Sequence, residues 1–225
     1  MYQESVTAAA PQTAPRANTS TRLGLFISLF SMIIIREVFL PLGANSSVRL
    51  TVLKEGCMFA VAGLLLWLVK RGEGLSLHSV GLGTSPLWKS VLWGFIAGAV
   101  CFAVVVGLAL LTHYGQASSY LDKFPIPVVT LVVLRAGIVE ELFYRGFAID
   151  RLQAVGLGRT ASIVLPLIIF SVGHWTGGWA NIVIALAAGG LLTAFYLWRK
   201  DLVSNMIAHF LVDFVANVLP RLAGA

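Results

Sequence analysis

The sequence predicts an all-α fold, a polytopic transmembrane helical bundle of about seven spans in which the fifth span is short or broken. The first observation is composition: 58% of the 225 residues are hydrophobic and only 12% are charged, whereas soluble domains usually carry about 25% charged residues. The second is a mean hydropathy of +0.87. The third is that apolar stretches long enough to cross a bilayer recur along the chain, with brief polar connections between them. The class is therefore an integral membrane protein.

Seven stretches account for the predicted spans, and each is about as long as a bilayer-crossing helix except the fifth. That stretch contains Pro166, so we expect it to be tilted, broken or only partly spanning. In the third stretch Gly94 and Gly98 form a GxxxG pattern that could bring two helices close together. The stretches are Leu23–Leu42, Val48–Val69, Trp88–Leu111, Ile126–Ala148, Thr160–Trp175, Trp179–Trp198 and Leu202–Leu219.

The organisation along the chain is a single helical bundle preceded by a tail. Residues 1–21 are rich in Ala, Thr, Ser, Pro and Gln and are predicted to be a disordered N-terminal tail. Residues 22–124 hold the first three transmembrane helices and their loops, and residues 125–220 hold the remaining spans. Cys57 and Cys101 lie in apolar runs, which favours small core residues over a disulfide or a cysteine metal site.

The formal net charge of +6 reads as a topology signal. The basic residues punctuate the apolar runs instead of clustering on polar faces among aromatic residues, which argues against a nucleic-acid partner. An N-in, C-out arrangement places nine basic residues on the cytoplasmic side and four outside, as the positive-inside rule requires. The expected location is the cell (plasma) membrane, with multiple crossings. The inside set is Arg16, Arg22, Lys70, Arg71, Lys89, Arg151, Arg159, Arg199 and Lys200, and the outside set is Arg49, Lys54, Lys123 and Arg221.

The most informative segment reads IVEELFYRGF, from Ile138 to Phe147, inside the fourth apolar stretch. Ionisable groups at such a place are costly and usually mark a functional site. On an α-helix Glu141 and Arg145, four residues apart, share a face, and Glu140 projects about 100° away. Arg145 would hold Glu141 ionised and fixed, whereas Glu140, without a cation four residues on, is suited to general-base work. The alternative interpretation is a structural ion pair that locks the helix end.

Two further polar pairs lie in later apolar stretches. His174 follows Phe170 by four residues, and Asp213 follows His209 by four. Either histidine alone could be a packed imidazole that is hydrogen-bonded to the backbone, but its partner motif favours a catalytic role. Arg36 and Glu37 in the first stretch are adjacent, so they face different ways, and we expect them to pair with other helices or with the interface.

Together these residues resemble a known family. EELFYR matches EExxxR, FSVGH matches FxxxH and HFLVD matches HxxxN/D, in that order. The pattern is similar to that of the CAAX prenyl protease and bacteriocin-processing family, also called the CPBP or Abi family, of intramembrane glutamic endopeptidases. The resemblance covers about Pro125 to Pro220, so residues 125–220 would be a CPBP-like catalytic core. The first 120 residues carry no motif that matches.

The resemblance implies a peptide hydrolase whose site residues can be carried over position by position. Glu140 would activate water together with His174, His209 and Asp213 would stabilise the oxyanion, and Glu141 and Arg145 would support the site. No metal or other cofactor is implied, and the partners would be membrane lipid and a peptide or protein substrate that is lipidated or membrane-bound. Many members have Asn at the position of Asp213, and an ionised aspartate would repel an oxyanion. We therefore expect Asp213 to orient a cationic His209 through a short contact.

Two alternatives remain open from the sequence. A zinc-dependent intramembrane protease could use Glu140, His174 and His209 as ligands, since two imidazoles and a carboxylate make a familiar zinc site. A non-proteolytic membrane immunity or scaffold protein could carry the same buried charges. The depths expected from the helical rise do not agree with a shared site. At 1.5 Å per residue, Glu140 lies about 12 Å from the cytoplasmic end and His174 about 21 Å from it.

Overall fold

The computed structural model describes residues 17–114 and 120–223, and every regular element in them is a helix. The predicted all-α class is therefore confirmed. The main elements are α1 (Thr19–Phe39), α2 (Val48–Trp67), α3 (Leu87–Thr112), α4 (Ile126–Arg135), η4 (Ala136–Ala148), α5 (Ile149–Ala154), α6 (Arg159–Val172), α7 (Gly178–Arg199) and α8 (Leu202–Asn217). The short elements are η1 (Leu68–Gly72), η2 (Leu77–Val80), η3 (Tyr120–Lys123), η5 (Trp175–Gly177) and α9 (Leu219–Leu222).

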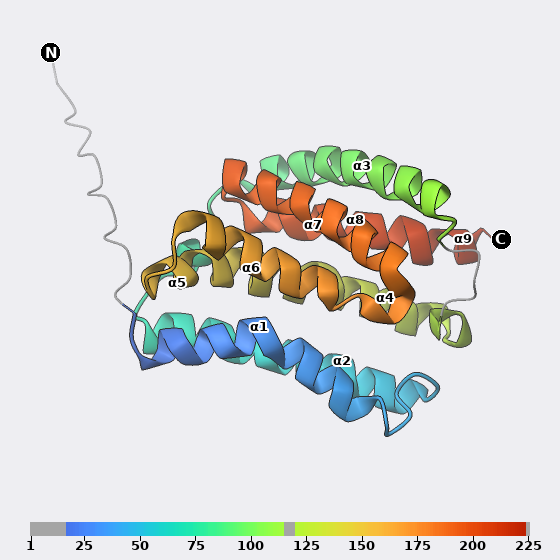
Figure 1. Ribbon diagram of the computed structural model, residues 1–225, viewed down its shortest axis with the longest axis horizontal. Helices are drawn as coiled ribbons and strands as arrows, with labels where there is room; N and C mark the ends of the chain where they lie inside the picture. The colour runs from blue at the N-terminus through green and yellow to red at the C-terminus, as the bar shows by residue number, and fades with distance from the viewer. Residues whose placement is uncertain (1–16, 115–119, 224–225) are drawn as a thin grey trace, which may run out of the picture.

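The helices run along the long axis of the molecule and alternate in direction (Figure 1). α1 and α2 form one side of the bundle, α3 and α7 lie on the other, and α6 lies between them in this view (Figure 1). Most of the predicted tail, residues 1–16, lies outside the described residues. Its last residues are helical, because Thr19–Thr21 form the first turn of α1, where the Asn18 side chain accepts a hydrogen bond from the Thr21 amide at 2.9 Å.

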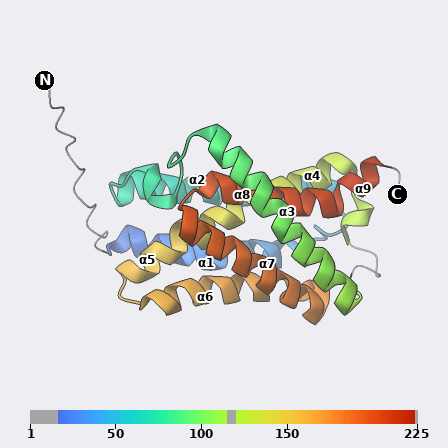
Figure 2. The ribbon, with the colours of Figure 1, turned by 90° about the horizontal axis from the view of Figure 1, so that it is seen from above.

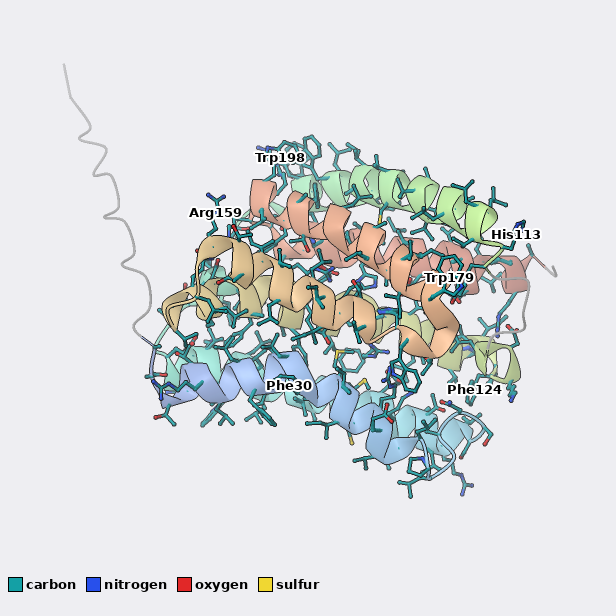
Figure 3. All side chains as sticks on the ribbon, viewed as in Figure 1. Phe30, His113, Phe124, Arg159, Trp179 and Trp198 are labelled. Carbon is teal, nitrogen blue, oxygen red and sulfur yellow. The ribbon has the colours of Figure 1, made fainter. Side chains whose placement is uncertain are left out.

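The exterior of the bundle is apolar, as expected for a protein in lipid. In the part of the chain that the structure describes, three helical segments are long and apolar enough to cross a membrane, namely Val48–Gly72, Leu87–Thr112 and Trp175–Arg199. Trp198 and Trp179 lie at opposite ends of the bundle (Figure 3) and are 65% and 69% exposed. Tryptophan at both ends fits the aromatic belts at the two membrane interfaces. The helices and their surface together indicate an integral membrane protein.

The fourth and fifth predicted spans show how far hydropathy describes the backbone. The fifth is short, as expected: α6 has 14 residues and contains Pro166. The fourth is not a single α-helix, because α4 passes into the 13-residue π-helix η4 and then into α5. In a π-helix the backbone bonds join residues five apart, so the side-chain neighbours expected from α-helical spacing change there.

Glycines hold α8 close to two other helices. A Cβ atom at Gly94 would lie 2.7 Å from Cβ of Ile207, and one at Gly98 would lie 3.3 Å from the Ala208 carbonyl oxygen. From the other side, a Cβ atom at Gly137 in η4 would lie 3.0 Å from the Met206 carbonyl oxygen. The GxxxG pattern therefore does bring two helices together, with α3 crossing α8 obliquely (Figure 2). The backbone of α8 is fixed between α3 and η4.

Candidate active site

The π-helix η4 carries the EELFYR segment through the centre of the bundle. Twelve of its 13 residues are buried, and its apolar side chains belong to the largest core cluster. π-Helical turns are rare and are frequent at functional sites. Neighbouring elements α1, α2, α4, α5, α6 and α8 all contact η4. Charged side chains of this segment are therefore surrounded by protein.

The carboxylate of Glu141 is hydrogen-bonded through both oxygens, and it joins two helices. Its Oε1 accepts hydrogen bonds from Nη1 of Arg145 at 2.8 Å and from Nδ1 of His209 at 2.7 Å. Its Oε2 accepts from Nδ2 of Asn205 at 3.0 Å. The side chain of Glu141 is 0% exposed. The predicted pair of Glu141 with Arg145 is present, and it also ties η4 to α8.

Arg145 extends the same hub to α6 and α7. Its Nη2 donates to the Gly189 carbonyl at 3.1 Å and its Nε to Oγ1 of Thr193 at 3.3 Å. Its guanidinium lies 4.4 Å from the centre of the Phe170 ring, close enough for a cation–π contact. Because several donors of this guanidinium are used, Arg145 fixes the positions of three helices around Glu141.

Glu140 has a different environment from the one that α-helical spacing suggested. Its Oε1 contacts Nη1 of Arg135, five residues earlier, a spacing that the π-helical turns make possible. Glu140 has no cation four residues on, as the sequence showed, but i,i+4 geometry did not reveal Arg135 as its partner. Oε2 of Glu140 is buried and has no hydrogen-bond partner among the described residues. One oxygen of Glu140 is held, and the other makes no hydrogen bond within residues 17–114 and 120–223.

Arg135 belongs to a buried network that the sequence reasoning missed. Its Nε donates to Oε2 of Glu55 on α2 at 2.6 Å, and Oε1 of Glu55 lies 3.1 Å from Nζ of Lys54. Lys54 was expected at the outer interface, but it is only 6% exposed. The sequence signal that could have revealed this network is that Lys54, Glu55 and Arg135 are ionisable residues inside predicted apolar stretches.

His174 lies at the end of α6, and its ring is held from one side. Nδ1 lies 2.8 Å from the carbonyl oxygen of Phe170, which can only accept a hydrogen bond, so Nδ1 carries a proton. In the neutral ring Nε2 is then an acceptor. The ring centres of His174 and Phe170 are 4.8 Å apart, and those of Phe170 and His209 are 6.1 Å apart. Because the Phe170 ring also lies 4.4 Å from the Arg145 guanidinium, His174 lies at the level of the EELFYR segment, and the depth disagreement from uniform helical rise does not hold.

His209 is oriented by Glu141, and the contact with Asp213 is weaker than expected. Nε2 of His209 lies 3.6 Å from Oδ2 of Asp213, longer than a hydrogen bond, whereas Nδ1 lies 2.7 Å from Glu141. The Asp213 side chain is 33% exposed, against 8% for His209. The short His–Asp contact that we expected is therefore not formed. Nε2 remains on the side of the ring away from Glu141.

Arg36 pairs with another part of the bundle, as expected, but it also contacts Glu37, although adjacent residues were expected to face different ways. Nε of Arg36 donates to Oε1 of Glu37 at 3.0 Å. Nη1 of Arg36 also donates to the Gly173 carbonyl at 2.5 Å, and its guanidinium lies 5.8 Å from the Trp175 ring. Both contacts flank His174. Arg36 therefore fixes the turn that carries the histidine.

The proposed zinc ligands do not form a recognisable metal site. Within residues 17–114 and 120–223, no group of three or more His, Cys, Asp or Glu side chains is placed to hold a metal ion. Oε1 of Glu140 contacts Arg135, and Nδ1 of His209 is bonded to Glu141. The zinc alternative therefore gains no support from this geometry.

Comparison with known proteins finds a family model that matches the part of the chain holding these residues. Residues 122–215 match the family model described as type II CAAX prenyl endopeptidase Rce1-like. The family predicted from the motifs is confirmed. The matched segment holds Glu140, Glu141, His174, His209 and Asp213. No curated protein and no solved structure gives a significant match.

This CAAX endopeptidase family indicates a peptidase of the CAAX protease type that acts on a peptide or protein. The apolar helices place the peptidase in a membrane. The residues before position 122 lie outside the match, yet α1 and α2 contribute Arg36 and Glu55 to the surroundings of the motif residues.

Proposed function

We propose that this chain is an intramembrane glutamic endopeptidase of the cell membrane, which hydrolyses a peptide bond by glutamate-activated water. Glu140 is the general base, and His174 assists it. His209 stabilises the oxyanion, Glu141 and Arg145 hold the site together, and Asp213 has a minor electrostatic part. No metal or cofactor takes part in this mechanism.

The observation that carries the proposal is the difference between the oxygens of the two motif glutamates. The two oxygens of Glu141 accept three hydrogen bonds from protein groups, two on Oε1 and one on Oε2. Oε2 of Glu140 is buried and has no partner among the described residues. The guanidinium of Arg135 on Oε1 favours the carboxylate form, which is the form able to take a proton. Glu140 is therefore the better base.

The reaction follows from these positions in two steps. Oε2 of Glu140 takes a proton from water while the Nε2 acceptor of His174 can share that water, and the hydroxide oxygen bonds to the scissile carbonyl carbon. The carbonyl π electrons move to the oxygen. His209, whose Nδ1–H is held by Glu141, acts as an imidazolium in this step, so that its Nε2–H donates a hydrogen bond to the new oxyanion. The oxyanion then re-forms the carbonyl, the C–N bond breaks, and the proton held by Glu140 passes to the leaving amine. Losing one such oxyanion donor typically costs about 2.7–4 kcal/mol of barrier.

The substrate class that the family description suggests is a peptide with a prenylated CAAX-type C-terminus. A membrane-embedded site fits a substrate whose lipid chain lies in the same bilayer. We also propose that the end of the bundle rich in Lys and Arg faces the cytoplasm.

The test uses the full chain reconstituted in phospholipid vesicles with a fluorescence-quenched farnesylated CAAX peptide. We expect cleavage by wild type at one bond, identified by mass spectrometry, and loss of cleavage by about 10²–10⁴-fold in Glu140→Gln. An equally active Gln variant would rule out the general-base role. Loss of activity on chelation that returns with Zn²⁺ would instead support the zinc protease, and no cleavage of any tested peptide by folded wild type would support an immunity or scaffold role.

A further inference from the structure

A buried chain of four charges leads from α2 to Glu140. Lys54 lies 3.1 Å from Glu55, Glu55 accepts from Arg135 at 2.6 Å, and Arg135 contacts Oε1 of Glu140. All four residues are buried, with exposures of 6% for Lys54, 0% for Glu55, 8% for Arg135 and 7% for Glu140. Lys54 and Glu55 precede the segment that matches the family model, and none of the three motifs includes Arg135.

The geometry of a guanidinium explains why an arginine lies at the centre of this chain. Its donors are fixed in one plane, so holding one carboxylate on Nε limits where another carboxylate can lie on Nη1. Glu55 occupies the Nε position, and Glu140 occupies Nη1. The orientation of Arg135, set from α2, therefore determines the position of Oε1 of Glu140.

Charge balance fits the same arrangement. Arg135 has a carboxylate on each side, and Glu55 has Lys54 as a second cation. Because Arg135 holds Oε1, the carboxylate of Glu140 cannot rotate freely, and its Oε2 points in one direction.

We propose that Arg135 and Glu55 are positioning residues for the general base. Glu55 fixes Arg135, and Arg135 holds Oε1 of Glu140 so that Oε2 is presented to the attacking water. This inference rests on the proposed role of Glu140. Through Glu55, the half of the chain that carries no family motif contributes to catalysis.

The experiment is a double-mutant cycle on the full chain in vesicles, with the farnesylated peptide as substrate. Variants are Arg135→Gln, Glu55→Gln, the double variant, and Arg135→Lys. A base misplaced by about 1 Å can cost about 10²-fold, so we expect Arg135→Gln to lower kcat by about 100-fold with KM unchanged. Glu55→Gln should have a smaller effect. Because Glu55 acts through Arg135, the double variant should be no slower than Arg135→Gln.

Arg135→Lys keeps the positive charge. It therefore allows the positioning role to be measured even if Arg135→Gln does not fold. An ammonium lacks the planar fork, so this variant should unfold near the wild-type temperature and have a kcat between those of wild type and Arg135→Gln. The matched control is Glu73→Gln, which breaks another buried Arg–Glu pair, with Arg151, whose side chains are 1% and 2% exposed. We expect this control to lower the unfolding temperature but to keep the kcat of the folded protein.

The outcomes separate this inference from the proposed function. If Glu140→Gln is inactive while folded Arg135→Lys and Glu55→Gln both keep the wild-type kcat, the inference alone is overturned. If the Arg135 and Glu55 effects add independently, Glu55 does not act through Arg135 and its positioning role is overturned. An active Glu140→Gln variant overturns both proposals.

Discussion

Adjacent residues Glu140 and Glu141 lie in two different charge networks. Around Glu141, three donors from η4 and α8 use both carboxylate oxygens, and Arg145 links this hub to α7. Around Glu140, one guanidinium holds one oxygen and leaves the other without a partner among the described residues. The first network favours stability, and the second favours reactivity. Two identical residue types therefore differ in how many donors each receives, and we expect different roles from them.

The largest expected effect is on stability, from Arg145→Ala. This change leaves the buried carboxylate of Glu141 without its cation, and breaking such a pair typically costs about 3–5 kcal/mol. Thermal and denaturant unfolding in detergent would measure the loss. The double variant Glu141→Gln, Arg145→Gln should be milder than either single change, since it removes both charges. An Arg145→Ala protein that unfolds like wild type would show that the pair is not structural.

The next effect is on activity, from Glu140→Asp. The shorter side chain cannot both reach Arg135 and present its second oxygen at the same place. A displacement of about 1 Å should lower kcat by about 10²-fold, with little change in unfolding temperature. The comparison is Glu141→Asp, which should lower the unfolding temperature more than Glu140→Asp does. The same kcat for Glu140→Asp and wild type would contradict a requirement for exact placement.

Two glycines of α3 test whether the close packing of α3 against α8 contributes to stability. A Cβ atom at Gly94 would overlap Ile207, whereas a Cβ atom at Gly107 would meet nothing within 4 Å. We expect Gly94→Ala to destabilise the protein by about 1–3 kcal/mol through overpacking. Gly107→Ala should be neutral or slightly stabilising, because alanine is the better helix former. Equal unfolding temperatures for the two variants would mean that α3 and α8 can move apart freely.

The smallest effect is expected from Asp213→Asn. Glu141 holds the ring of His209, and Asp213 is 3.6 Å away, so kcat should fall by less than about tenfold, or about 1.4 kcal/mol. His209→Gln in the same assay provides the reference for losing the oxyanion donor. If the Asn variant is as slow as His209→Gln, Asp213 has a direct part in catalysis.

Hydropathy predicted the helices well, because a long apolar stretch in lipid must satisfy its own backbone hydrogen bonds and therefore forms a helix. Val48, for example, begins both the predicted second span and α2, and Pro166 marked the short fifth span correctly. The π-helix η4 was not predicted. An apolar segment is compatible with i→i+4 or i→i+5 backbone bonds, and its hydropathy does not distinguish them.

The sequence reasoning identified the residues of the three motifs, and their assembly depends on contacts that spacing within one helix cannot give. The i,i+4 rule predicted the pair of Glu141 and Arg145 correctly. It missed Arg135 as a partner of Glu140, because that contact has a spacing of five. The bond between Glu55 and Arg135 joins residues 80 positions apart, which local patterns do not encode.

Phe170 gives the FxxxH motif a geometric meaning. Its ring contacts His174 at 4.8 Å and the Arg145 guanidinium at 4.4 Å, and its centre is 6.1 Å from the ring of His209. One rigid aromatic ring is therefore a shared neighbour of the histidine that would share the attacking water and of the histidine that would meet the oxyanion. A change in the size of this ring would alter the surroundings of both imidazoles at once.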